Sequence, residues 1–224
     1  MHKPTHYELR EQASRQDTLL TFLDEFPGVV SSDLQSIDLE VDNGDEIVGL
    51  ICSYATNKNC EIIDFSRCQI TEEGAKSIAK ALKEGKYPSL QHLDLSYNDL
   101  SGNAVEYIAD ALMSNESLKT LILTGNDLGD DNVQKLADAL MSNESLEKLD
   151  LTNTNFGNDG LDALTEMLHV NKTLRSLDVA NNEDVNNPYS MFFFEKALAE
   201  KGLDLSSPSY EVDLSAFVHL YFTA

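Results

Sequence analysis

Apolar residues recur along the chain in a frame that repeats every 28 residues. Four consecutive segments align without gaps and match LxxLxLxxNxL over most of their length; they begin at Leu90, Leu118, Leu146 and Leu174. A fixed period of about 20 to 50 residues is typical of solenoids, in which each repeat packs against its neighbours. The chain is therefore predicted to be a solenoid.

Weaker copies of the frame extend it in both directions. One segment begins at Cys60, 30 residues before Leu90, and another begins at Leu34, 26 residues before Cys60. Downstream, residues 203–205 lie 26 residues after residues 177–179 and predict one more short strand. We therefore expect six to seven repeats.

Each unit changes its period halfway along. In LxxLxL the alternating apolar residues point inward from a short strand, and the residues between them face outward. The second half places apolar residues at i, i+3, i+4 and i+7, which marks one buried face of a helix; an example is Val105, Ile108, Ala109 and Leu112. The predicted fold is an α/β solenoid, a horseshoe segment with a concave parallel sheet and convex helices.

Polar residues recur at the two turns of each unit. Asn98, Asn126 and Asn182 follow the strand, where an amide can bond the backbone of neighbouring coils, and Cys68 and Thr154 take the same position. At the turn between helix and strand lie three Asn-x-Ser/Thr tripeptides 28 residues apart, beginning at Asn115, Asn143 and Asn171. Their spacing indicates turn chemistry rather than glycosylation.

Atypical ends are expected, because an open solenoid exposes its row of leucines to water. We assign residues 1–33 to an N-terminal helical cap, 34–185 to the repeats, and 186–224 to a C-terminal cap and tail. A helix beginning at Tyr189 is expected to pack on the last coil; the alternative is that Phe192 to Phe194 fill a partner groove. For the apolar tail 212–224 three alternatives stay open: it completes the cap, pairs with a sheet edge, or marks where a longer protein was cut.

The formal net charge is −23, with acidic residues spread along the whole chain. Such a field disfavours nucleic acid and anionic membranes and speeds encounter with basic proteins, although solubility alone accounts for it equally well. The N-terminus lacks the apolar core of a signal peptide, and no apolar stretch is long enough to span a membrane. Three cysteines without zinc-ligand spacing fit a reducing compartment. We expect a cytoplasmic monomer.

The frame also predicts which side chains are exposed along the sheet. One column contains Asp64, Asp94, Ile122, Asp150 and Asp178, so that carboxylates form a row across neighbouring strands. Beside the row we expect the exposed residues His92, Lys148, Arg67 and Tyr97. A basic protein partner would fit this surface, with Tyr97 and Ile122 as apolar anchors. The alternatives are that the row reflects solubility and descent, and that Lys148 pairs with Asp150 or a neighbouring acid.

No motif for catalysis or cofactor binding occurs in the chain. GxGxxG, GxSxG, HExxH and a Walker loop are all missing, and the five histidines are scattered. His92 beside the acidic row suggests an acid–base pair or a metal site, but a single surface histidine is more often a bystander. We therefore expect no enzymatic activity, no cofactor and no metal.

Repeats of this length, with a full helix and Asn or Cys at the turn, resemble the ribonuclease-inhibitor-like subfamily of leucine-rich-repeat proteins over residues 34–185. The resemblance implies protein recognition through the concave sheet. Two settings stay open: an effector that an intracellular bacterium secretes into the host cytosol, or a cytosolic eukaryotic regulator of the ribonuclease-inhibitor or tropomodulin sort. In Ran GTPase-activating proteins, a further alternative, activity depends on a loop arginine in a TGR-like context. Arg67 in SRCQI lacks that context.

Overall fold

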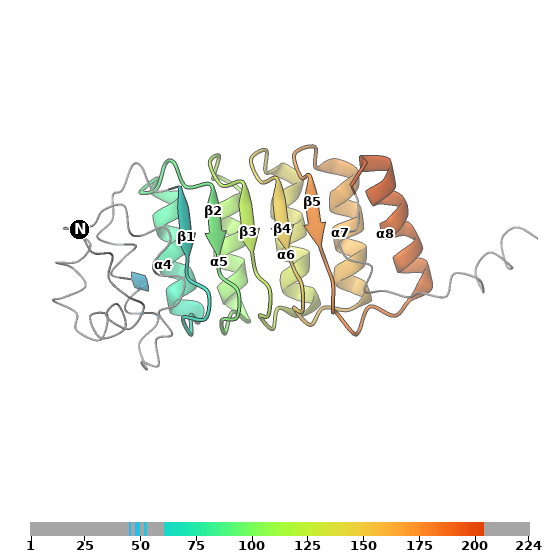
Figure 1. Cartoon of the computed structure of the whole chain (residues 1–224), viewed down its shortest axis with the longest axis horizontal. Helices are drawn as coiled ribbons and strands as arrows, with labels where there is room; N and C mark the ends of the chain where they lie inside the picture. Colours follow the sequence, from blue (N-terminus) through green and yellow to red (C-terminus); the bar gives the residue numbers. More distant parts are fainter. Residues whose placement is uncertain (1–44, 46–47, 50–51, 53–60, 204–224) are drawn as a thin grey trace, which may run out of the picture.

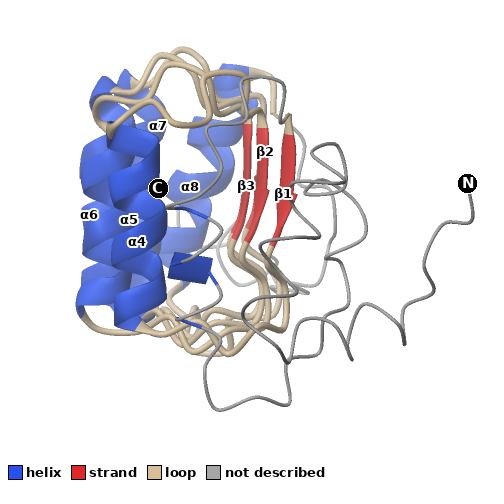
Figure 2. Ribbon diagram, turned by 90° about the vertical axis from the view of Figure 1, so that its left-hand side faces the viewer, coloured by secondary structure: helices blue, strands red, loops and turns tan. Residues whose placement is uncertain are grey.

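The structure is a computed structural model that describes residues 45, 48–49, 52 and 61–203. From residue 61 onward the chain alternates between short strands and helices. The elements are β1 (Ile62–Asp64), α4 (Glu72–Lys83), β2 (His92–Asp94), α5 (Asn103–Leu112), β3 (Thr120–Ile122), α6 (Gly129–Ser142), β4 (Lys148–Asp150), α7 (Asn158–Val170), β5 (Ser176–Asp178) and α8 (Pro188–Lys201). The strands form one layer and the helices a second, parallel layer (Figures 1 and 2). This arrangement confirms the predicted α/β solenoid.

The strands form one parallel sheet in chain order, from β1 to β5. Residues at the same frame position are partners, so Asp64 lies beside Asp94, and the column continues through Ile122, Asp150 and Asp178. The central residue of every strand is buried at 2% exposure or less: Ile63, Leu93, Leu121, Leu149 and Leu177. A slip of one residue would expose this row, and burial therefore fixes the register.

Each helix buries the face that its apolar period predicts. In α5, Val105, Ile108, Ala109 and Leu112 are all buried. A second buried position of the helices is alanine in α4, α5 and α6 and methionine in α7: Ala81, Ala111, Ala139 and Met167.

Asn126 shows how the turn asparagines join neighbouring coils. Its side-chain oxygen accepts hydrogen bonds from the backbone N–H groups of Asn98 and Leu100, both at 3.2 Å. Its amide nitrogen donates to the carbonyls of Leu95 at 3.0 Å and Leu123 at 2.8 Å. The predicted role of these turn residues is confirmed, and the same position is filled with comparable bonds by Asn98, Thr154, Asn182 and, through a thiol, Cys68.

A second ladder of polar residues lies at the turn between helix and strand. Asn143 donates to the carbonyls of Leu112 at 2.7 Å and Asn115 at 3.2 Å, and Asn171 repeats the pattern one unit later. Lys201 of α8 then donates to the carbonyl of Asn171 and so takes the place of the next asparagine. Asn143 and Asn171 are buried, as turn residues and not as glycan acceptors.

Helix α8 covers the last coil. Met191 and Phe194 are buried, which agrees with a helix packed on the array, while Phe192 and Phe193 stay 44% and 54% exposed. The predicted N-terminal cap, most of the repeat from Leu34, Cys60, most of the seventh strand and the tail lie outside the described residues. Leu203, the last described residue, is buried.

Candidate functional site

The acidic column lies where the frame predicts it, on the layer formed by the strands. Asp94, Asp150 and Asp178 are half-buried, with part of each side chain at the surface. Asp64 is only 6% exposed, so it is much less accessible to a partner than we expected. Ile122 interrupts the carboxylates on β3, the central strand of the described sheet.

Each of these carboxylates also closes the turn after its own strand. One oxygen accepts the backbone N–H two residues later, at 2.9 Å for Asp64, 2.8 Å for Asp94, 2.9 Å for Asp150 and 3.1 Å for Asp178. Asp150 accepts a second bond, from the Thr124 hydroxyl at 2.9 Å. The side chains are thereby held in one orientation, because an Asp that bonds the backbone two residues ahead forms a local turn.

The residues that begin the strands form a second column at the surface, in which Ile62 and Lys148 are exposed and the other three are half-buried. Ile62, His92, Thr120, Lys148 and Ser176 are partners in the sheet register. Neither His92 nor Lys148 makes an ion pair within the described part of the chain, so the pairing that we considered for Lys148 is not formed there. Among all the residues that the structure describes, no three or more potential metal ligands lie close enough together to hold an ion.

Arg67 and Tyr97 are brought into contact at the turns after β1 and β2. The guanidinium carbon of Arg67 lies 4.3 Å from the centre of the Tyr97 ring. The ring in turn lies against Gly125 of the next repeat, where an added Cβ would be 2.6 Å from the ring atom Cδ1. Arg67, Tyr97 and Gly125 thus form a stack across three successive repeats, and Tyr97 remains 49% exposed.

The backbone at this position is left-handed in every described repeat. The φ angle is +57° at Arg67, +55° at Tyr97 and +71° at Gly125, and the equivalent Asn153 and Asn181 have similar values. Backbone N–H groups connect the turns, from Arg67 to Ser96 O at 2.9 Å and from Tyr97 to Thr124 O at 2.7 Å. Glycine and asparagine adopt this conformation readily, whereas a bulkier residue costs about 1 kcal/mol or more. The conformation therefore does not explain why Arg and Tyr occupy the position.

A shallow pocket continues the surface from Tyr97 toward the C-terminal end of the sheet. Its volume is about 560 Å³, and it is lined by Tyr97, Thr124, Thr152, Asn153, Asn181, Asn182, Glu183 and Val185. The side chains of Asn153 and Asn181 are exposed and make no hydrogen bond to the residues that the structure describes. Neutral hydrogen-bonding groups thus lie beside the aromatic ring.

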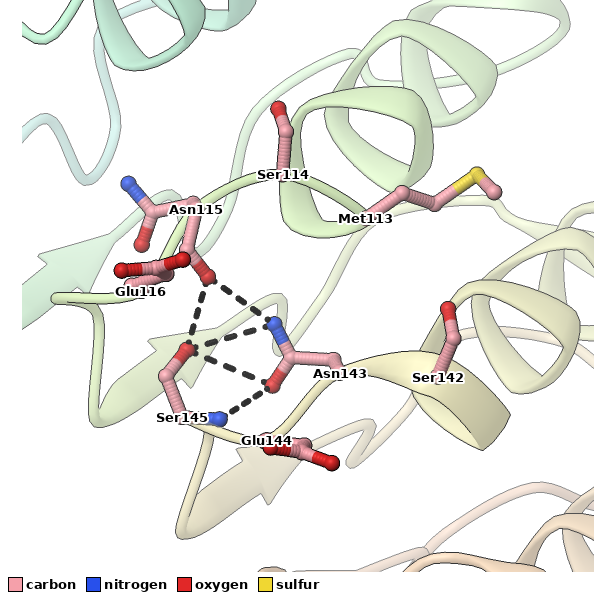
Figure 3. A pocket seen from close by; sticks show the side chains of 8 residues that line it. All are labelled: Met113, Ser114, Asn115, Glu116, Ser142, Asn143, Glu144 and Ser145. Atoms are coloured by element: carbon pink, nitrogen blue, oxygen red, sulfur yellow. Dashed lines mark hydrogen bonds between the residues drawn. The ribbon is translucent and has the colours of Figure 1, made fainter.

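A second pocket, of about 440 Å³, lies at the opposite edge, where α5 and α6 lead into the next strands (Figure 3). Met113 and the exposed carboxylates of Glu116 and Glu144 line it. In Figure 3 the amide of Asn143 and the hydroxyl of Ser145 converge on the carbonyl oxygen of Asn115, at 3.2 and 2.9 Å. The polar atoms in the floor of this pocket are therefore already used by the turn.

The repeats match a family model described as leucine-rich repeat over residues 56–79, 88–109, 114–137, 142–164 and 170–188. The chain belongs to the leucine-rich-repeat family. Two solved structures share the fold: the tropomodulin C-terminal domain of Caenorhabditis elegans and the actin-binding site 2 of leiomodin-1. The first has a TM-score of 0.57 and 12% identity over 71% of this chain and 93% of the other. For leiomodin-1 the TM-score is 0.55, with 17% identity over 72% of this chain and 88% of the other. A comparison with curated protein sequences gave no significant match.

Two structural features of the candidate site were not identified from the sequence. The turn-closing role of the aspartates is visible as the spacing Asp-x-Ser or Asp-x-Thr after β1, β2 and β4. The Arg67–Tyr97 contact has a weaker signal, which is that both residues share one frame position with Gly125. Among the described residues, no helix is both long and apolar enough to cross a membrane.

Proposed function

We propose that this leucine-rich-repeat protein is a non-enzymatic recognition module that binds a basic protein partner through the exposed face of β1–β5. The observation that carries the proposal is the row formed by Asp94, Asp150 and Asp178, which the sheet register places on neighbouring or next-neighbouring strands. Such a row complements a series of lysines or arginines on a partner.

The turn bonds prepare these carboxylates for binding. Each one uses a single oxygen for its backbone N–H, and the carboxylate of Asp94 makes no further hydrogen bond within the described residues. A group whose orientation is already fixed loses little freedom when a partner binds it. Ile122, within the same column, adds an apolar contact between the acidic positions.

The identity of the partner is a separate question. The similar leiomodin-1 structure is that of an actin-binding site, but 17% identity supports only a common fold. We therefore include actin as one probe and do not assign it as the partner. We further propose that the protein acts in the cytoplasm, either of its own cell or of a host cell after secretion.

The test compares two triple charge reversals in the full chain. In the first variant Asp94, Asp150 and Asp178 become Lys; in the control, the exposed helix residues Asp138, Asp162 and Glu166 become Lys. Both variants change the net charge equally, so general electrostatic attraction falls by the same amount. We expect the first to lose the proteins that the wild type captures from lysate, or purified actin if actin binds, while the control retains them. Equal capture by the wild type and both variants would contradict the proposal.

A further inference from the structure

In a strongly acidic protein, Arg67 is an exposed cation that has no acidic partner among the described residues. The chain has 39 acidic residues and 16 Lys and Arg residues. Even so, the guanidinium of Arg67 makes no ion pair or hydrogen bond with any residue that the structure describes. Its five N–H donors are therefore available to a ligand.

The guanidinium is nevertheless held in place. It stacks on Tyr97 with a separation of 4.3 Å, and the Tyr97 ring fills the space left by the missing side chain of Gly125. Stacking uses the face of the guanidinium and leaves its N–H edge open. Arginine and tyrosine are also among the residue types that are enriched at the energetic centres of protein interfaces.

We infer that Arg67, stacked on Tyr97, binds a carboxylate of the protein partner, an Asp or Glu side chain. The inference rests on the proposed function, since the acid belongs to the same partner that meets the acidic row. The planar guanidinium can hold both oxygens of a carboxylate with two parallel hydrogen bonds. The amides and hydroxyls of the adjoining pocket, among them Asn153 and Asn181, match the backbone groups that flank such a residue.

The surroundings favour a carboxylate over a phosphate. Asp64 and Asp94 end β1 and β2, three residues before Arg67 and Tyr97. Glu183 lines the adjoining pocket, and the whole chain carries a net charge of −23. This field repels a dianion about twice as strongly as a monoanion, and the site offers only one cation. A single-charged ligand with matching geometry is therefore the better fit.

The site also gives the partner a direction. Its basic residues meet Asp94, Asp150 and Asp178 along the sheet, while its acidic residue meets Arg67 at the turn after β1. A partner that is basic throughout would leave Arg67 facing like charge. The mixed pattern therefore selects one orientation on the sheet, as charge complementarity does in specific interfaces.

The test uses NMR on the full chain with two capped nonapeptides. Both carry lysines at one end and neutral polar residues in the middle; the other end carries Glu in one peptide and Gln in its control. We expect the Glu peptide alone to shift the Arg67 Nε–H signal and the Tyr97 ring signals saturably. Tyr97→Ala should weaken this binding about two- to five-fold, which is the range for a lost cation–π contact. Tyr97→Phe should retain it, because the ring persists.

Lys76 supplies a matched control, since its ammonium lies 5.9 Å from the Tyr107 ring on the helical layer. Lys76→Ala should leave binding of the Glu peptide unchanged. The inference is overturned if the Glu and Gln peptides shift Arg67 equally, if neither does, or if Tyr97→Ala binds as tightly as the wild type. The proposed function is tested separately, by the NMR signals of the Ser96 and Thr152 backbone amides, which bond Asp94 and Asp150. Lysines bound at the acidic row should shift these amide signals with either peptide.

Discussion

The ring of Tyr97 occupies the space that a side chain at Gly125 would need, since a Cβ there would lie 2.6 Å from Cδ1 of the ring. Gly125 also has a φ of +71°, which disfavours alanine and most other residues with a Cβ. We predict that Gly125→Ala lowers the free energy of unfolding by about 1–3 kcal/mol, as for other strained backbone positions. Urea unfolding followed by circular dichroism measures the change.

A substitution at Gly129 separates the backbone strain from the steric clash, the two contributions to this loss of stability. Its φ is +66°, yet an added Cβ would meet nothing within 4 Å. Gly129→Ala should therefore show the backbone effect without the clash, and its loss of stability should be the smaller of the two. In a Tyr97→Ala background the Gly125→Ala loss should fall to the Gly129→Ala level. An unchanged loss in that background would show that the ring does not rest on Gly125.

Asn126 is predicted to be among the most sensitive polar positions in the array. It is 1% exposed, and its side chain bonds backbone groups of Asn98, Leu100, Leu95 and Leu123. Asn126→Ala removes the partner of the Asn98 and Leu100 N–H groups and of the Leu123 carbonyl, at a cost of about 1–3 kcal/mol for each buried unsatisfied group. The carbonyl of Leu95 keeps a second bond, from the Asn98 amide at 2.9 Å. We expect a loss of at least about 2 kcal/mol in the free energy of unfolding, measured by urea titration. Asn103→Ala, at an exposed position on α5, should stay within about 0.5 kcal/mol of the wild type.

The 28-residue frame was sufficient to predict the fold because each layer has its own period. Alternation identified the strands around Leu93 and Leu121, and the i, i+3, i+4, i+7 pattern identified helices such as α5. The acidic column was predictable for the same reason, because equivalent frame positions become neighbours when identical units stack. Stacking also made the role of Asn126 predictable from its place at the turn.

The local chemistry of the candidate site was harder to predict, because it depends on dihedral angles and side-chain rotamers. The frame placed Arg67, Tyr97 and Gly125 in one column, but it does not give the side-chain rotamers that bring the Arg67 guanidinium onto the Tyr97 ring. The burial of Asp64 likewise depends on its surroundings at the start of the sheet and not on its frame position, which it shares with the more exposed Asp94. Periodicity predicts the strand and the face on which a side chain lies, whereas contacts with neighbouring residues decide its exposure and orientation.

Lys201 is predicted to stabilise the C-terminal end of the turn ladder. It donates to the carbonyl of Asn171, a group whose equivalents Asn115 and Asn143 are bonded by the following repeat. Lys201→Met keeps much of the side-chain bulk but removes the donor, so we expect a loss of about 1 kcal/mol in the free energy of unfolding. Lys196→Met on the same helix removes only an exposed pair with Glu200, 3.8 Å long, and should change stability by less than about 0.5 kcal/mol. Equal effects from the two substitutions would contradict the role assigned to Lys201.

Cys52 should make the stability of the protein fall at high pH. Burial raises the pKa of its thiol from 9.0 to about 12, with a smaller opposing effect from Lys86. Between these two values the unfolded chain loses the proton while the folded chain keeps it, so unfolding becomes easier as the pH rises. Well below pH 9 the contribution is fully present, and by pH 10, one unit above the pKa in the unfolded chain, about 1.4 kcal/mol of it should be lost, since one pKa unit corresponds to about 1.4 kcal/mol. Urea unfolding between pH 8 and pH 10 should show this fall in the wild type and a shallower one in Cys52→Ala, because Tyr and Lys residues titrate alike in both proteins. Parallel curves would mean that the Cys52 thiol ionises as easily in the folded protein as in the unfolded chain.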